Sequence, residues 1–251
     1  MTEIALDPKP ANVPRRLNRV NRRHTMRTRH TLLNLPAALA VILGGELATA
    51  DERESREVNY AYDASAAKLI EIDIYAGEVR LEQGDTNEVR VTGKLELVRQ
   101  HTKAQEELAK IEPKVETGES FTLTLAKGSG PRYAVDITIT VPRGVPLDVY
   151  LQYGEMNVIV TPPNDATFAL RAGELDINVP RETVADVVAS AAFGEVSLSG
   201  FGEEDGDAPR KLLVGAKYAG HVGSASEGGA PKLTATVTFG EVSIDAVEPA
   251  G

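Results

Sequence analysis

The sequence predicts an all-β protein, a single-stranded β-helix (β-solenoid) whose coils are about 20 residues long and which carries one short helix. Three observations predict this fold. Apolar and polar residues alternate over most of residues 58–247, a unit of glycine, acidic residue and apolar residue recurs, and its glycines from Gly154 onward are 19, 21, 26 and 20 residues apart. An antiparallel β-sandwich or meander is the alternative, because Gly-Glu can also form a two-residue hairpin turn.

The recurring unit supplies six candidate turn glycines and five glutamates that directly follow one of them. The glycines are Gly77, Gly154, Gly173, Gly194, Gly220 and Gly240. The glutamates are Glu78, Glu155, Glu174, Glu195 and Glu241, whereas His221 follows Gly220. The inward-facing positions before and after Gly-Glu are an odd number of residues apart, so the alternation shifts by one residue there. We therefore expect a bend at each glycine, which tolerates positive φ.

This bend places the neighbouring side chains on opposite sides of the corner. We expect the glutamates on the outside, where equivalent residues of stacked coils would form a carboxylate ladder at a spacing of roughly 4.8 Å. We expect Tyr153, Phe193 and Phe239, which directly precede three of the glycines, to fill the inner corner as a partial aromatic ladder.

Residues 1–50 resemble an export signal. A basic stretch ends at Arg29, a 14-residue apolar run spans Leu32 to Gly45, and "ATA" precedes Asp51. The run is shorter than the roughly 20 residues that a membrane-spanning helix needs, although a retained helix is the alternative. We expect cleavage after Ala50, with Met26 as an alternative start, and an exported protein, periplasmic or extracellular, without membrane insertion.

The rest of the chain divides into a linker and one β-repeat domain. We expect a linker over residues 51–57, a domain over 58–247 and a disordered tail over 248–251. Within the domain, residues 58–152 are less regular and 153–247 carry the regular repeats. The segment "TKAQEELAKI" predicts a helix near residues 102–111 that covers an end or edge of the β body.

Charge and cysteine content exclude several classes of function. The net charge is −10, and residues from 51 onward carry 19 basic and 34 acidic residues. An acidic body repels phosphate backbones, which argues against a nucleic-acid partner. The chain has no cysteine, so disulfides, cysteine metal sites and thiol catalysis are excluded.

Several segments together resemble a known family. They are "LIEIDIYAGEVRLEQGDTNEVRVTGKLEL", "YAVDITITVPRGVPLDVYLQYGEMNV", the repeated glycine-acid units and the ending "GGAPKLTATVTFGEVSI". Over nearly all of residues 58–245 the chain is similar to the bacterial putative-adhesin β-strand-repeat family, a domain of unknown function. The resemblance implies an exported, right-handed β-helix-like domain, and it carries over no catalytic residues.

The acidic residues allow two kinds of chemistry. The glutamate ladder could hold calcium or a cationic surface, and Glu203, Glu204, Asp205 and Asp207 are a second calcium candidate. The ladder lacks the dense ligand spacing of calcium loops, and the cluster lacks their full pattern with a distal glutamate. We therefore favour solvated residues and expect no cofactor, with Ca²⁺ left open. Paired carboxylates could also cleave glycosides, but regular recurrence suits a scaffold better than one catalytic centre.

The sequence therefore predicts a non-enzymatic, exported interaction module of the envelope or cell surface. Its partner would be an envelope protein or a glycan. An enzyme acting on envelope polysaccharides and a periplasmic accessory or sensor protein are the alternatives.

Overall fold

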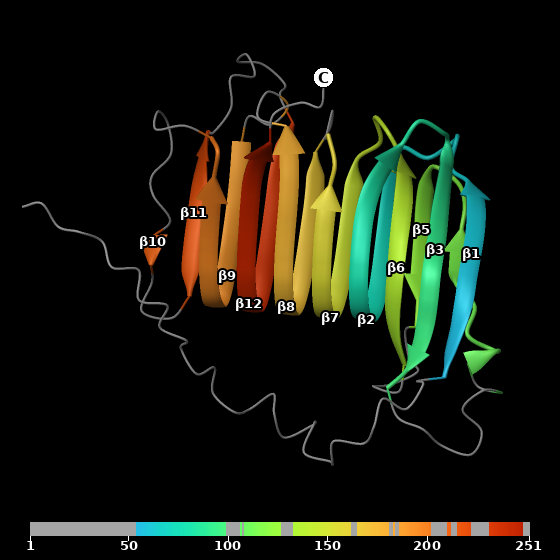
Figure 1. Ribbon diagram of the computed structural model, residues 1–251. Helices are drawn as coiled ribbons and strands as arrows, with labels where there is room; N and C mark the ends of the chain where they lie inside the picture. The colour runs from blue at the N-terminus through green and yellow to red at the C-terminus, as the bar shows by residue number, and fades with distance from the viewer. Residues whose placement is uncertain are drawn as a thin grey trace, which may run out of the picture. The chain divides into compact units, whose positions relative to one another are not determined.

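The computed structural model (Figure 1) describes ten parts of the chain, all within one compact unit, Asp51–Gly251. They are residues 54–98, 106, 108–126, 133–161, 165–180, 183, 186–201, 210–211, 215–221 and 231–247. Several predictions lie outside these residues: the signal peptide with its cleavage after Ala50, the start at Met26, the acidic cluster at Glu203–Asp207, the tail over 248–251 and residues 51–53 of the linker. Residues 55–57 of the predicted linker instead belong to the first strand, Ser55–Asp63.

The described residues form twelve strands, and the all-β class is confirmed. The strands are β1 (Ser55–Asp63), β2 (Leu69–Gly84), β3 (Glu88–Leu97), β4 (Lys114–Glu116), β5 (Ser120–Leu125), β6 (Tyr133–Pro142), β7 (Leu147–Ile159), β8 (Ala166–Pro180), β9 (Asp186–Ser199), β10 (Arg210–Lys211), β11 (Ala216–His221) and β12 (Lys232–Val247). No helix is among these elements. Half of the predicted helix over 102–111 lies outside the described residues; within the other half, Glu106 and Leu108 have helical conformation and Leu108 is buried.

All twelve strands belong to one mixed, open sheet. Its order is β1-β3-β6-β2-β7-β8-β12-β9-β11-β10, with β5 pairing β2 and β4 off this path. The five middle strands β2, β7, β8, β12 and β9 are parallel to their neighbours in that row. Antiparallel pairing, which the alternative prediction expected, occurs toward both ends, in β1–β3, β3–β6, β4–β5, β9–β11 and β10–β11.

Each of the five middle strands bends at its glycine. Figure 1 shows these strands running along one side of the sheet, turning at their lower end and returning on the other side. The bend glycines pair with one another in the order Gly77, Gly154, Gly173, Gly240, Gly194. At Gly240, φ is 136° and an added Cβ would lie 1.8 Å from the carbonyl oxygen of Gly173. Both the backbone angle and the close approach of the next strand therefore require glycine.

The core lies between the two halves of the bent sheet. In β8, Phe168 and Leu170 are buried before the bend, and Leu175 and Ile177 are buried after it. Leu170 and Leu175 are an odd number of residues apart, so the inward phase shifts across the bend. No polar or charged side chain is buried among the described residues, and removal of this aliphatic surface from water drives the folding.

The order of the repeats differs from a solenoid whose coils stack in sequence order. Such a solenoid would place β9 beside β8, but β12 lies between them and is parallel to both. The alternation and the bend glycine determine which residues of two neighbouring strands pair. Both features are the same in every repeat. Equivalent repeats can therefore exchange places, so the periodicity does not determine which repeat lies next to which.

Gly220 does not belong to the row of bend glycines, in contrast to its alignment in the sequence. It lies in β11, which runs antiparallel to the first half of β9, and it pairs with Val187. The adjoining His221 pairs with Asp186. The sequence carried a signal of this difference, because Lys217 and Gly215 stand where the other repeats have apolar core residues.

Candidate functional site: the bend edge

The five bends form one edge of the sheet, which we call the bend edge. It carries the predicted glutamates in a single row, in the order Glu78, Glu155, Glu174, Glu241, Glu195. All five side chains are exposed. Neighbouring strands are roughly 4.8 Å apart, so each carboxylate has a like charge on the next strand. The structure therefore places these glutamates as the outward ladder that the sequence predicts.

Repulsion within this row affects the protonation of Glu241. Loss of hydration raises the pKa of Glu241, and the charges of Glu195, Glu174 and Asp176 raise it further. Glu241 lies between Glu174 and Glu195 in the row, where two like charges act on it. The ionised form of Glu241 is therefore disfavoured in the fold, and a cation placed beside it would relieve the repulsion.

A second row on the bend edge consists of rings and one guanidinium. Tyr75 and Tyr153 meet edge to face with their ring centroids 5.7 Å apart, and Cζ of Arg171 lies 5.6 Å from the centroid of Tyr153. Phe239 and Phe193 stack with centroids 4.9 Å apart and planes 9° apart. Each of the five strands β2, β7, β8, β12 and β9 thus contributes one member, and we call this row the aromatic strip.

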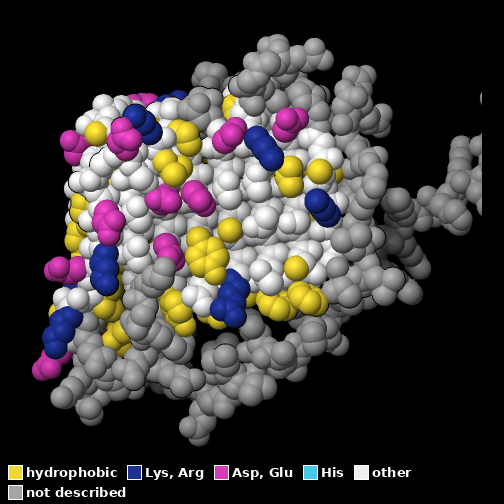
Figure 2. All heavy atoms as spheres, turned by 180° about the vertical axis from the view of Figure 1, so that it is seen from behind, with side chains coloured by type: hydrophobic (Ala, Val, Ile, Leu, Met, Phe, Trp, Pro, Cys, Tyr) yellow, Lys and Arg dark blue, Asp and Glu magenta, His cyan; other side chains and the backbone are white. Residues whose placement is uncertain are grey.

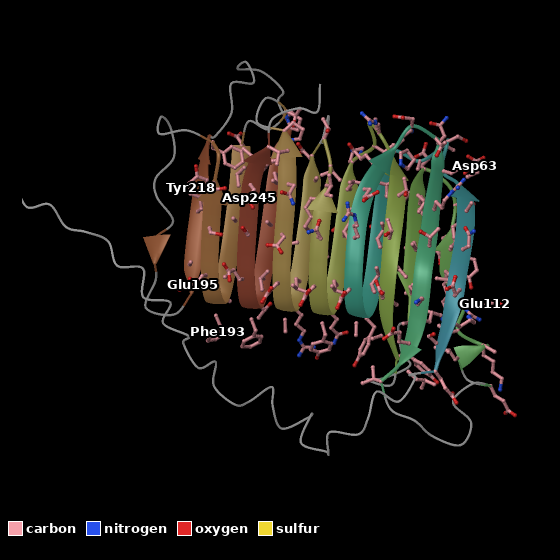
Figure 3. All side chains as sticks on the ribbon, viewed as in Figure 1. Asp63, Glu112, Phe193, Glu195, Tyr218 and Asp245 are labelled. Atoms are coloured by element: carbon pink, nitrogen blue, oxygen red, sulfur yellow. The ribbon has the colours of Figure 1, made fainter. Side chains whose placement is uncertain are left out.

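The aromatic strip lies on the outside of the bends, which corrects the prediction that its rings fill the inner corner. Tyr153 is 37% exposed, Phe239 is 50% exposed and Phe193 is 52% exposed. Figure 3 shows Phe193 beyond the lower end of the sheet, with Glu195 nearby. The backbones of neighbouring bends also approach each other closely; a Cβ on Gly194 would lie 1.6 Å from the carbonyl oxygen of Gly240.

Two members of the strip were missed by the sequence interpretation. Tyr75 and Arg171 each stand two residues before a bend glycine, whereas the predicted rings stand one residue before it. Aligning both positions across all repeats would have shown that five strands each supply one planar group.

The sheet surface away from the bend edge carries charged side chains of both signs. Figure 2 shows the back of the molecule, where charged side chains are scattered and hydrophobic ones gather toward the lower border. Above the bends, Asp176 has a raised pKa because of lost hydration and the nearby charge of Asp245. The hydroxyl of Ser199 donates a hydrogen bond to Asp245, and Ser197 and Ser243 are hydrogen-bonded at 3.2 Å.

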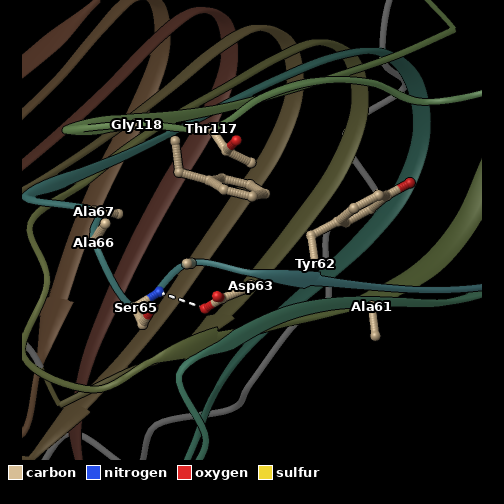
Figure 4. Close-up of a pocket in the computed structure, with 10 residues that line it drawn as sticks. Ala61, Tyr62, Asp63, Ser65, Ala66, Ala67, Thr117 and Gly118 are labelled. Atoms are coloured by element: carbon tan, nitrogen blue, oxygen red, sulfur yellow. Dashed lines mark hydrogen bonds between the residues drawn. The ribbon is translucent and has the colours of Figure 1, made fainter.

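A cavity of about 450 Å³ lies between the end of β1 with the turn that follows it, residues 61–67, and the turn before β5 (Figure 4). Tyr62 and Phe121 are the largest side chains that line the cavity, and Asp63 is the acidic residue of this lining. The Ser65 amide donates a hydrogen bond to Oδ1 of Asp63 at 2.9 Å. Hydrogen bonds from the backbone and the side chain of Ser65 lower the pKa of Asp63. Glycoside cleavage uses two carboxyl groups, and this lining supplies one.

The described residues contain no group of three or more His, Cys, Asp or Glu residues arranged to hold a metal ion. In the same part of the chain, no helix has the length and apolar character needed to cross a membrane.

Comparisons with known proteins leave the family open. No family model and no curated protein matches the chain. A putative cell adhesion protein from Clostridium sporogenes ATCC 15579 is 13% identical over 77% of this chain and 100% of its own, with a TM-score of 0.47. A putative adhesin from Bacteroides fragilis NCTC 9343 is 11% identical over 75% of this chain and 97% of its own, with a TM-score of 0.23. Both scores are too low to assign a family, so the resemblance to the putative-adhesin repeat family stays a prediction.

Proposed function

We propose that the protein is an exported, non-enzymatic interaction module of the cell envelope or surface, built as a β-solenoid-like scaffold with an adhesin-like role. One observation carries the proposal: five neighbouring parallel strands each present one planar group and one glutamate along the bend edge, and the glutamates pair in register. The partner would be an envelope protein or a glycan that contacts several of these strands at once.

The form of the bend edge supports an extended partner rather than a small substrate. Small-molecule sites are concave and bury most of their ligand. The aromatic strip instead leaves Tyr153, Phe239 and Phe193 exposed by a third to a half, on the outside of the bends. Exposed aromatic side chains gathered in one place are typical of interaction surfaces.

The rigidity of the scaffold supports the same role. Glycine backbones pack directly against one another along the bend, and the neighbouring strands hold each repeated side chain at a fixed spacing. A partner that binds such a row loses little entropy in ordering the protein side of the interface. Because the strands are repeats, each one would contribute a similar small part of the binding free energy, which suits a long partner.

The enzyme alternative has less support in the arrangement of the carboxylates. General acid–base catalysis on a glycoside requires two carboxyl groups with separated pKa values on opposite sides of one substrate bond. On the bend edge the glutamates form one straight row on one surface. Export rests on the predicted signal peptide, for which residues 1–50 supply the sequence features.

An assay on envelope material tests the proposal. The purified full chain is incubated with isolated cell walls and membranes, and both its retention in the pellet and the release of soluble saccharides are measured. We expect retention without release. Saccharide release that is abolished by a single substitution such as Glu174→Gln would establish the enzyme alternative. An unprocessed protein in the cytoplasm, shown by fractionation and N-terminal sequencing, would contradict export.

A further inference from the structure

We propose that the part of the bend edge formed by β12 and β9 binds an extended peptide segment rich in arginine or lysine. This inference rests on the proposed function and names the chemistry of its partner. The site consists of the stacked rings of Phe239 and Phe193 and the carboxylates of Glu174, Glu241 and Glu195.

The two phenylalanines provide a flat apolar surface that is open to solvent. They stack at 4.9 Å with nearly parallel planes, yet half of each side chain remains exposed. Phe193 belongs to β9, the last of the five bent strands, and β11 continues the sheet beside only the first half of β9. A planar or cationic group of a partner can therefore lie against this end of the strip.

The chain itself already seats a guanidinium in the same strip. Arg171 of β8 lies over the ring of Tyr153 of the adjacent strand β7 at 5.6 Å, within the range of a cation–π contact. Phe239 and Phe193 continue the strip on the next two strands with the same kind of surface. A partner arginine on these rings would thus repeat a contact that the fold makes once with its own side chain.

The glutamate row supplies the complementary charge. Glu241 and Glu195 each follow a phenylalanine of the strip by two residues on the same strand. Mutual repulsion among Glu241, Glu195 and Glu174 contributes to the raised pKa of Glu241. A positive charge beside the row removes this repulsion, so the binding of a cation and the ionisation of Glu241 favour each other.

Charge also separates this partner class from the others. A neutral glycan could stack on the rings and donate hydroxyl hydrogen bonds to the glutamates, but it carries no positive charge to offset their mutual repulsion. Nucleic acid and an anionic lipid surface would be repelled by the same row. A basic peptide in an extended conformation uses both rows at once, through its cationic groups and through the aliphatic stems of its side chains.

Fluorescence anisotropy with the full-length protein tests the inference. The probe is a labelled peptide of alternating arginine and glycine, and the matched control peptide carries citrulline, an uncharged isostere, in place of arginine. We expect the arginine peptide to bind at low salt and the citrulline peptide to bind at least tenfold more weakly, because citrulline lacks the charge used in both contacts.

Three double variants locate the site. F193L/F239L keeps apolar side chains but removes the rings, and we expect about threefold to tenfold weaker binding. E195Q/E241Q should weaken binding and reduce its dependence on salt. E57Q/E116Q removes two exposed glutamates of β1 and β4, away from the bend edge, and should change affinity less than twofold.

Two results would overturn the inference. Equal weakening by E57Q/E116Q and E195Q/E241Q would mean that the peptide responds only to the overall negative charge. Unchanged binding in F193L/F239L would mean that the rings take no part. If a neutral envelope oligosaccharide binds and F193L/F239L abolishes that binding while the arginine peptide fails, the peptide class is wrong but the proposed function stands.

Discussion

Replacing Gly240 by alanine tests the role of the bend glycines. The new Cβ would lie 1.8 Å from the carbonyl oxygen of Gly173, and 2.9 Å from its carbonyl carbon. Non-bonded carbon and oxygen atoms do not approach closer than about 3 Å, so β12 and β8 must move apart by more than about 1 Å. That displacement stretches the parallel hydrogen bonds on both sides of the bend.

The expected loss of stability combines two effects. Alanine at a φ of 136° is strained by about 1–3 kcal/mol. Overpacking against a neighbouring backbone costs about 1–3 kcal/mol more. We therefore expect G240A to lower the free energy of unfolding by about 4 kcal/mol, a value at the high end for a single substitution.

Gly144 offers a matched control. It also has a positive φ, 82°, but an added Cβ there would meet no atom within 4 Å. G144A should therefore lose only the backbone term, about 1–2 kcal/mol. Urea unfolding followed by far-ultraviolet circular dichroism measures both variants, provided that the transition is two-state. Equal losses in G240A and G144A would refute the close packing of neighbouring bends as the reason for glycine.

Two further predictions follow from the glutamate row and the strand order. Because the pKa of Glu241 is raised in the fold, its charge opposes folding above that pKa, and the opposition disappears as the pH falls toward the unfolded-state pKa. E241Q should thus raise the free energy of unfolding at neutral pH by less than about 1 kcal/mol and have no effect in acid. Urea titrations at both pH values measure this change. A loss of stability at neutral pH would instead reveal a stabilising ionic role for Glu241. Truncation before Lys232 removes β12 and leaves the facing edges of β8 and β9 without their partner. We therefore expect aggregation or strand rearrangement, which size-exclusion chromatography would detect. A monomer with unchanged stability would contradict the observed strand order.

Local patterns predicted the parts of the fold that depend on one repeat alone. Alternation predicted strands, and the phase shift between Leu170 and Leu175 predicted a bend at Gly173. The outward position of Glu174 followed from the same shift. These features depend only on side-chain direction within a strand, which has a fixed period of two.

Features that depend on contacts between repeats could not be predicted in this way. The position of β12 between β8 and β9 depends on which equivalent strand packs best, and every repeat offers the same register. On the outside of the bend Phe193 stacks on Phe239 of the neighbouring strand, which is a contact of two strands together. Gly220 was misassigned because a glycine with an apolar residue two positions later, here Val222, also occurs in an antiparallel strand.

The central claim is that the bend edge is the interaction surface. The most direct test compares the retention of three full-length proteins on isolated envelope material: the unchanged chain, F193S/F239S, and V98S, which alters a similarly exposed apolar residue outside the bend edge. We expect F193S/F239S to lose retention while V98S and the unchanged chain bind equally. Equal retention of all three proteins would contradict the claim.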